Sequence, residues 1–464
     1  MEKIIESVGK AGEKWEEAGL EKRLAVLKEA GQLLADKRTK LCECLQNEGL
    51  SNNLARDYSQ WVIQAADPNL LEKYAQNMVQ WVNLVQGGEL LIRRADGIVL
   101  VFGQAGSPTF NAATIFSLLL PGNGIIFVRA PFVDGGVRFI FEQILHPILL
   151  KHGFDIELVQ LVTDKYREAV EFFVAHKELK TILSIGSATD NANIAKKAHE
   201  NNKKVILEHY GRGSMVIWKD ANIDEVTSSA QRVFDFSSRP CFIPKLFLVH
   251  DHVYDEFINA FIDRIANSKT VENDKDTGVI VPIGKPDAYL AMIADAQEKG
   301  RIRYGGYQTN AQGKIDKKGI YVAPTIVTFD AKDCLKTKIR CVDEEIFFPI
   351  APVVRFRGSD EEILTNMHSI ITRHPVGLRT SIWTNKIDVR QFFLKKVKNS
   401  SLIRFNSDHS QSPKYASFWG SGEGDNHLFW ERSSHIQAID CSQMSREETK
   451  NILTSLGCSS FIQL

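Results

Sequence analysis

Residues 203–224 read Lys-Lys-Val-Ile-Leu-Glu-His-Tyr-Gly-Arg-Gly-Ser-Met-Val-Ile-Trp-Lys-Asp-Ala-Asn-Ile-Asp and carry the strongest local pattern of the chain. An apolar run, Lys204 to Leu207, ends at Glu208, and a second one, Met215 to Trp218, follows two glycines. Short apolar runs bounded by glycine and acidic residues are typical of buried strands. We therefore expect a strand on each side of the glycines, with Glu208 at the end of the first.

The segment before this stretch alternates strand and helix. Helix-length segments such as 135–151 and 166–176 separate four short apolar runs. The expected strands are Ile98 to Phe102, Gly124 to Val128, Ile156 to Val162 and Thr181 to Ile185. This βαβ pattern predicts an α/β fold with a parallel, doubly wound sheet.

The fourth of these strands leads into the turn Gly186-Ser187, which precedes an expected helix over residues 192–200. Backbone N–H groups at the start of a helix that follows a strand can bind an anion. Such a turn can hold the pyrophosphate of a dinucleotide. An ordinary α/β connection is the alternative, because many such loops have the same composition.

A candidate nucleophile lies downstream in residues 234–245, which read Phe-Asp-Phe-Ser-Ser-Arg-Pro-Cys-Phe-Ile-Pro-Lys. Arg239 and Lys245 flank Cys241, and cations lower a thiol pKa from its usual value of about 8.5. We therefore expect a reactive thiolate suited to covalent catalysis, with Glu208 as a general base across a cleft. The alternatives are a buried structural cysteine and a solvent-facing or helix-capping carboxylate.

The composition narrows the class of protein. The chain has 464 residues, with 57 basic and 57 acidic side chains, so nucleic acids and membranes are not expected partners. Seven cysteines without regular spacing do not form a disulfide framework, and the histidines form no spaced cluster, so we expect no metal. Residues 1–22 are charged throughout, so we expect no signal peptide and a cytoplasmic location.

A hairpin is expected over residues 79–98. The turn Gln86-Gly87-Gly88-Glu89 separates two runs of alternating apolar residues. Two strands are too few to be stable alone, so we expect them to pair with another part of this chain or with another subunit.

In their order, these motifs resemble the aldehyde dehydrogenase family across nearly the full length. Leu207-Glu208 and the glycines after it resemble that family's Leu-Glu-Leu-Gly-Gly, and residues 220–224 resemble its Asp-Ala-Asp-Leu-Asp. Cys241 lies 33 residues after Glu208, which is close to the family's spacing. Residues 345–349, Glu-Ile-Phe-Phe-Pro, resemble Glu-Ile-Phe-Gly-Pro.

The resemblance implies an architecture of three parts. Residues 1–78 and 99–210 would form a Rossmann-like cofactor domain, and residues 211–412 an α/β catalytic domain. Residues 79–98 and 435–464 would form a β oligomerisation arm, in a homodimer or homotetramer.

The resemblance also implies a reaction. The Cys241 thiolate would attack an aldehyde, the thiohemiacetal would lose hydride to NAD or NADP, and Glu208 would activate the water that hydrolyses the thioester. Glu345 would hydrogen-bond the nicotinamide ribose, and Phe347 would pack near the nicotinamide ring.

On the cofactor side, the resemblance assigns Gly186 and Ser187 to the pyrophosphate. Arg129 is the nearest cation after the second strand of the first sheet. No carboxylate accompanies it where the family binds the adenosine ribose, and an arginine in that setting suits the 2′-phosphate of NADP.

The chain departs from the family pattern in the loop after the first strand, Gly103-Gln-Ala-Gly-Ser-Pro108, which lacks the usual oxyanion-hole asparagine. Ser107 or Asn111 could replace this donor. Two alternative functions stay open. An acyl-thioester reductase is suggested by residues 123–127 and by Pro240 before the cysteine, although that subgroup commonly lacks the Glu208 base. The departures also allow a catalytically degenerate homologue with a structural or binding role.

Overall fold

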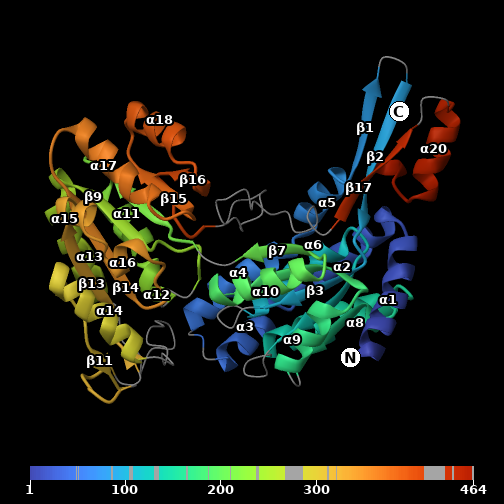
Figure 1. Ribbon diagram of the computed structural model, residues 1–464, viewed down its shortest axis with the longest axis horizontal. Coiled ribbons are helices and arrows are strands. Elements are labelled where there is room, and N and C mark those ends of the chain that lie inside the picture. The colour runs from blue at the N-terminus through green and yellow to red at the C-terminus, as the bar shows by residue number, and fades with distance from the viewer. Residues whose placement is uncertain are drawn as a thin grey trace.

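The structure is a computed structural model, shown in Figure 1. It describes residues 1–464 except 49, 51, 85–86, 104–107, 130–134, 164–165, 187, 209–210, 237–239, 267–285, 311–312, 320, 412–433, 441–443 and 462–464. Three residues singled out from the sequence, Ser107, Ser187 and Arg239, lie outside the described residues.

The first sheet of the described chain has five parallel strands in the order β5-β4-β3-β6-β7. Their bounds are β3 (Ile98–Phe102), β4 (Gly124–Val128), β5 (Val159–Val162), β6 (Leu179–Ile185) and β7 (Lys204–Glu208). The doubly wound parallel sheet predicted from the sequence is confirmed. One expected strand is shorter than predicted, because residues 156–158 form a 3₁₀ turn before β5 begins.

Helices cover both faces of this sheet. Every residue of the central strands β3 and β4 is therefore buried. Val99 and Val101 face one helical layer, and Ile98 and Leu100 face the other. The helices are α1 (Glu2–Glu17), α2 (Leu20–Asp36), α3 (Arg38–Asn47), α4 (Asn52–Ala65), α5 (Pro68–Gln76), α6 (Pro108–Leu119), α7 (Gly135–Arg138), the π-helical η1 (Phe139–Leu145), α8 (His146–Lys151), α9 (Tyr166–Ala175) and α10 (Ala188–Glu200). No helix of the described residues is long and apolar enough to cross a membrane.

The second sheet has seven described strands in the order β10-β13-β14-β9-β8-β15-β16, parallel except for β10. Figure 1 shows it at the other end of the long axis from the first sheet. Its strands are β8 (Ser214–Ile217), β9 (Leu246–His250), β10 (Arg301–Tyr304), β13 (Thr325–Asp330), β14 (Ile350–Phe356), β15 (Leu378–Trp383) and β16 (Ser400–Phe405). The pair β11 (Gln308–Thr309) and β12 (Tyr321–Val322) forms a separate small sheet.

Two hydrophobic clusters, one on each face, hold the second sheet between helices. Met215 and Phe247 pack into one cluster, and Val216 and Leu248, their neighbours along β8 and β9, pack into the other. The helices are α11 (Ile223–Ala230), α12 (Arg232–Asp235), α13 (Asp251–Ala266), α14 (Pro286–Lys299), α15 (Ala331–Lys336), α16 (Arg340–Asp343), α17 (Asp360–Thr372) and α18 (Ile387–Lys396).

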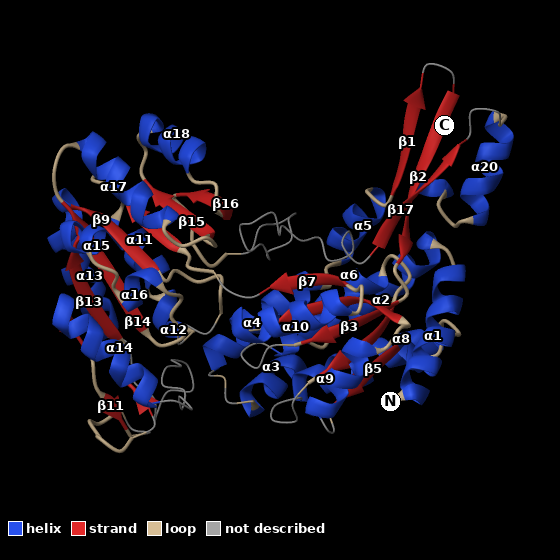
Figure 2. Ribbon diagram, in the orientation of Figure 1, coloured by secondary structure: helices blue, strands red, loops and turns tan. Residues whose placement is uncertain are grey.

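A three-stranded antiparallel sheet extends from the first domain as an arm, shown in red at the upper right of Figure 2. It consists of β1 (Val79–Leu84), β2 (Gly87–Ala95) and β17 (Ser434–Asp440), with β2 in the centre. The predicted hairpin is therefore confirmed, and the third strand comes from the C-terminal part of the same chain. The terminal helix α20 (Arg446–Ser455) follows, with a capping box formed by Ser445 and Glu448.

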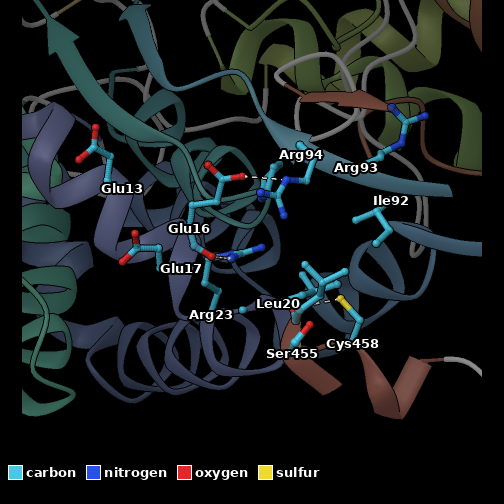
Figure 3. Close-up of a pocket in the computed structure, with 13 residues that line it drawn as sticks. Glu13, Glu16, Glu17, Leu20, Arg23, Ile92, Arg93, Arg94, Ser455 and Cys458 are labelled. Carbon is cyan, nitrogen blue, oxygen red and sulfur yellow. Dashed lines mark hydrogen bonds and ion pairs between the residues drawn. The ribbon is translucent and has the colours of Figure 1, made fainter. Parts of the chain in front are cut away.

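The C-terminal segment returns to the N-terminal helices at the base of the arm. Gly19 and Gly457 both have positive φ, and a Cβ added to Gly19 would lie 3.0 Å from the Gly457 Cα atom. A cavity of about 360 Å³ lies beside this contact (Figure 3). Among its lining residues, Glu16 pairs with Arg94 at 3.2 Å, and Arg23 donates to the backbone carbonyls of Leu120 and Glu16.

Candidate active site

Glu208 is the last residue of β7, and it is only 4% exposed. Its backbone carbonyl accepts hydrogen bonds from the Gly186 N–H and from Asn191 Nδ2, each at 3.0 Å. Asn191 is held in turn by Ser184, whose Oγ donates to its Oδ1 at 2.7 Å. The turn after β6 and the start of α10 are therefore fixed to the end of β7, and Glu208 is not a solvent-facing carboxylate.

Cys241 lies in the short connection between α12 and β9, and its side chain is partly exposed. It packs against the hydrophobic core of the first domain rather than lying inside it. The connection is anchored by the carbonyl of Gly213, which accepts from the N–H of Lys245 at 2.8 Å. Cys241 therefore lies at the edge of this core, where it is partly buried and partly exposed.

Four charged side chains act on the thiol of Cys241. Burial raises its pKa above the ordinary value, the negative charges of Glu208 and Glu345 raise it further, and the positive charges of Arg379 and Lys245 lower it. Because a Coulomb interaction falls with distance, these effects place all four groups around the sulfur. The site therefore joins the end of the first sheet to three segments of the second domain.

The predicted thiolate at neutral pH is wrong, because burial outweighs the two cations and the thiol pKa is raised. The resting group is the protonated thiol, so a base must take its proton before the sulfur can attack a carbonyl. A carboxylate such as that of Glu208 can supply this base.

Lys245 connects the cysteine segment to residues 345–347. Its Nζ donates to the Ile346 carbonyl at 2.8 Å and lies 4.9 Å from the centre of the Phe347 ring. Burial lowers the Lys245 pKa to about 8 and raises the Glu345 pKa to about 8, and each charge opposes the shift of the other. Phe347 is 48% exposed, so its ring has a free face beside the site.

On the cofactor side, Gly186 lies directly after β6 and before α10. The helix begins at Ala188 rather than at the predicted residue 192, so its N-terminus is closer to the turn than expected. Arg129 follows β4, and its N–H donates to the carbonyl of Val162 at 2.9 Å. Arg129 is 4% exposed, so it is a buried residue and not a surface arginine.

Aromatic residues join the cysteine segment to α4 of the first domain. The rings of Trp61 and Phe242 lie edge to face with centroids 4.5 Å apart, and the centroids of Trp61 and Phe236 lie 4.9 Å apart. All three are at most 8% exposed. An ion pair between Arg232 and Asp57 at 3.0 Å supports the same contact.

The sequence analysis missed two buried residues, Arg379, which acts on the thiol, and His409, whose carbonyl accepts a hydrogen bond from Arg379. Arg379 lies in β15, all of whose residues are buried, and its guanidinium carbon lies 4.9 Å from the centre of the Phe242 ring. His409 is fully buried, and its Nδ1 lies 2.8 Å from Ser381 Oγ. The available signal was an arginine inside the expected strand that begins at Leu378, since a charged side chain is seldom fully buried without a partner.

Asn111, a candidate oxyanion donor, lies on α6 and is fully buried. Its side-chain nitrogen and oxygen make no hydrogen bond within the described residues. An unsatisfied buried amide is costly, so this side chain is an unusual feature of the core. Within the described residues, no group of three or more side chains with metal-ligand chemistry is found.

Comparison with known proteins identifies the family. A model of the aldehyde dehydrogenase family matches residues 1–428. The chain belongs to the aldehyde dehydrogenase family. The resemblance inferred from the sequence is therefore confirmed.

Curated members of the aldehyde dehydrogenase family are distant in sequence. The D-glyceraldehyde dehydrogenase (NADP(+)) of Thermoplasma acidophilum is 24% identical over 62% of this chain and 56% of its own length. The 1-pyrroline-5-carboxylate dehydrogenase of Staphylococcus aureus is 24% identical over 73% of this chain and 67% of its own length. The chain thus matches little more than half of the first relative.

Solved structures show the same fold over nearly the whole chain. The glyceraldehyde-3-phosphate dehydrogenase GapN of Methanocaldococcus jannaschii, in complex with NADP, has a TM-score of 0.78 and 20% identity, covering 94% of this chain and 93% of that one. An NAD-dependent aldehyde dehydrogenase from Sinorhizobium meliloti has a TM-score of 0.82 and 15% identity, covering 94% and 86%. The predicted aldehyde-dehydrogenase-like fold is confirmed.

Proposed function

We propose that this chain oxidises an aldehyde to a carboxylic acid, with NAD or NADP as the hydride acceptor. The observation that carries the proposal is the convergence of Glu208, Glu345 and Lys245 on the Cys241 thiol. A nucleophile, a base and the predicted cofactor contacts come from segments far apart in the sequence. Such a convergence of perturbed groups is typical of an active site.

The chain's own residues suit two proton transfers. Glu208 takes the proton of Cys241, and the sulfur attacks the aldehyde carbon to give a thiohemiacetal. Departure of hydride leaves a thioester on Cys241. Glu208 loses the thiol proton to solvent and is ionised again. It then takes a proton from water, whose oxygen attacks the thioester carbon. The carboxylic acid leaves as the C–S bond breaks, and Glu208 returns the proton to the sulfur. Asn111 is our candidate donor to the oxyanion, together with the N–H of Cys241.

The residues present fit a nicotinamide dinucleotide. Both carboxylate oxygens of Glu345 are buried, and within the described residues they receive at most a weak contribution from the Gly211 N–H, which leaves acceptors for ribose hydroxyls. When bound, the cofactor accepts hydride. Phe347 would pack near its ring, and Gly186 with Ser187 would hold its pyrophosphate at the start of α10.

Arg129 is our candidate for a 2′-phosphate contact, which would favour NADP over NAD. The NADP named in two of the relatives supports this choice. We also propose that residues 1–78 and 99–210 bind the cofactor, that residues 211–412 carry the catalytic segment, and that the protein is cytoplasmic.

We propose further that the arm of β1, β2 and β17 pairs with another subunit. Both outer strands of this sheet have an edge without a strand partner among the described residues, and open edges are usually covered. The result would be a homodimer or homotetramer.

The decisive experiment is to incubate the full chain with NAD or NADP and a panel of aldehydes, and to follow the absorbance of the reduced cofactor. We expect turnover without coenzyme A and its loss in Cys241→Ala. In Glu208→Gln, in which the thiol loses its proton to solvent instead, we expect one equivalent of reduced cofactor followed by a trapped acyl-enzyme, detected by mass spectrometry.

Two outcomes would contradict hydrolytic oxidation. Turnover that requires coenzyme A identifies an acyl-thioester reductase instead. An absence of turnover, together with an unchanged unfolding temperature when either cofactor is added, identifies a degenerate homologue.

A further inference from the structure

A buried arginine beside the thiol has no evident catalytic task. Arg379 is the second residue of β15, which lies between β8 and the edge strand β16 in the second sheet, and it is 1% exposed. Removing a guanidinium from water is costly unless its charge and its N–H groups are matched. Burial is severe enough to lower its pKa to about 9.

Within the described residues, only one of the three guanidinium nitrogens of Arg379 has hydrogen-bond acceptors. Nη1 donates to the carbonyls of His409, Ser410 and Gln411 at 3.3, 3.0 and 3.4 Å. Nε and Nη2 are buried and have no hydrogen-bond acceptor within the described part of the chain. These two nitrogens form the edge of the guanidinium that binds a carboxylate or phosphate through two parallel hydrogen bonds.

The surroundings of Arg379 are positively charged. Lys245 and Arg404 act electrostatically on His409 together with Arg379, and His409 is neutral because burial and these three cations hold its pKa well below the usual value. Asp408 is a carboxylate that acts on Arg379, but it forms its ion pair with Arg232, at 3.6 Å. No described carboxylate forms a salt bridge with Arg379.

The guanidinium is also close to the reacting atom. It lies over the ring of Phe242, the residue after Cys241, and it is the strongest of the positive charges that lower the thiol pKa. Ser381, two residues along β15 and therefore on the same face, contacts His409, so this side of the strand is polar.

We propose that Arg379 binds an anionic group of the substrate through Nε and Nη2, so that the enzyme prefers aldehydes that carry a second group with two acidic oxygens, a carboxylate or a phosphate. This proposal rests on the aldehyde oxidation proposed above. The bound anion would replace the missing acceptors and hold the aldehyde carbon beside Cys241, so that Arg379 acts as a specificity-determining residue.

The first test needs no mutation. kcat/KM is measured for a series of ω-oxo carboxylates of increasing length, for their methyl esters and for glyceraldehyde 3-phosphate against glyceraldehyde. We expect an anionic aldehyde to exceed its neutral counterpart by about 30-fold or more at the best length, as expected for a buried charge pair. If neutral aldehydes are oxidised equally well with full dependence on Cys241, the anion site is refuted and the proposed function stands.

The second test is the ratio of kcat/KM between the anionic and the neutral substrate in Arg379→Lys and Arg379→Met, because this ratio does not depend on the fraction of folded enzyme. We expect the ratio to fall at least tenfold in both variants, since lysine keeps the charge but lacks the paired donors. Arg212→Lys is the matched control. Arg212 is also 1% exposed, and within the described residues both of its terminal nitrogens donate to backbone carbonyls. It is not among the charges that act on the Cys241 thiol, so the ratio should not change. An equal loss for both substrates in Arg379→Lys would refute the proposal.

A binding measurement separates this inference from the proposed reaction. Succinate and inorganic phosphate are titrated into the full chain by calorimetry, with succinamide as the neutral comparison. We expect one anion to bind, with its Kd raised at least tenfold in Arg379→Lys but not in Arg212→Lys. An absence of anion binding to the unmodified chain would overturn the inference, whether or not any aldehyde is oxidised.

Discussion

At the scale of single residues, the candidate site is governed by opposing charges around the sulfur of Cys241. Burial and two carboxylates favour the protonated thiol, and two buried cations favour the thiolate. The protonated form prevails, so the reactivity of the sulfur depends on pH and on each neighbouring charge.

This balance predicts the effect of Glu208→Gln on alkylation of Cys241. Removing the carboxylate removes a charge that raises the thiol pKa, so the apparent pKa should fall and the rate with iodoacetamide near pH 8 should increase about threefold to tenfold. The measurement is the alkylation rate from pH 6 to 10, with Cys241 identified by peptide mass spectrometry. A slower reaction in Glu208→Gln would show instead that Glu208 activates the resting thiol more than its charge opposes ionisation.

Some of these residues could be predicted from the sequence and others could not. Glu208 and Cys241 stand in contiguous patterns, at the end of an apolar strand and between two prolines, and so local sequence was sufficient. The raised thiol pKa depends on burial, which no local pattern reveals. Arg379 donates to carbonyls of residues 409–411 and packs over the ring of Phe242. These partners are distant from it in the sequence, so no local pattern could reveal its surroundings.

At the scale of elements, apolar runs predicted strands such as β3, β4 and β9, because these strands are buried along their whole length and are therefore apolar. The start of α10 was misplaced for a physical reason. Small polar residues at 187–191 are typical of a turn, but the Asn191 side chain bonds the Glu208 carbonyl and Ser184, which stabilises the extra helical turn.

Helix packing gives a second prediction, from two glycines in helices. In Gly31→Ala on α2, the new Cβ would lie 2.1 Å from the Ala66 carbonyl oxygen, so the helices must separate. We expect the free energy of unfolding to fall by about 1–3 kcal/mol although alanine favours helix. Urea unfolding followed by circular dichroism measures this change.

Gly9→Ala on α1 is the matched control for this prediction. Its nearest neighbour, Ile98 Cδ1, would be 3.8 Å away, an ordinary contact. We expect a gain of about 0.5–1 kcal/mol, because only the helix propensity changes. Equal effects at Gly31 and Gly9 would contradict the packing of α2 against the residues after α4.

At the scale of the whole molecule, the sequence predicted the hairpin of the arm but not how the chain's two ends meet. The contact of Gly19 with Gly457 joins residues at opposite ends of the sequence, and no local pattern specifies it. The third strand of the arm, β17, is likewise supplied from the far end of the chain.

The arm gives a prediction about assembly. Ile436 on the edge strand β17 is 56% exposed, and we expect another subunit to cover it. Ile436→Lys would place a charge in that contact and should weaken association at least tenfold, seen as a lower mass by light scattering across a dilution series. Leu394→Lys is the control, because Leu394 is 50% exposed on α18, outside the arm. An unchanged mass in Ile436→Lys would place the subunit contact elsewhere.

The main-chain oxygen of Glu208 receives both the Gly186 amide and the Asn191 side chain, so a single peptide group links the nucleotide turn to the carboxylate. A ligand that shifts the turn therefore also reorients the group that we assign to water activation. Binding at the nucleotide turn and water activation by Glu208 would then be coupled without a moving lid, because both depend on the position of the Glu208 carbonyl.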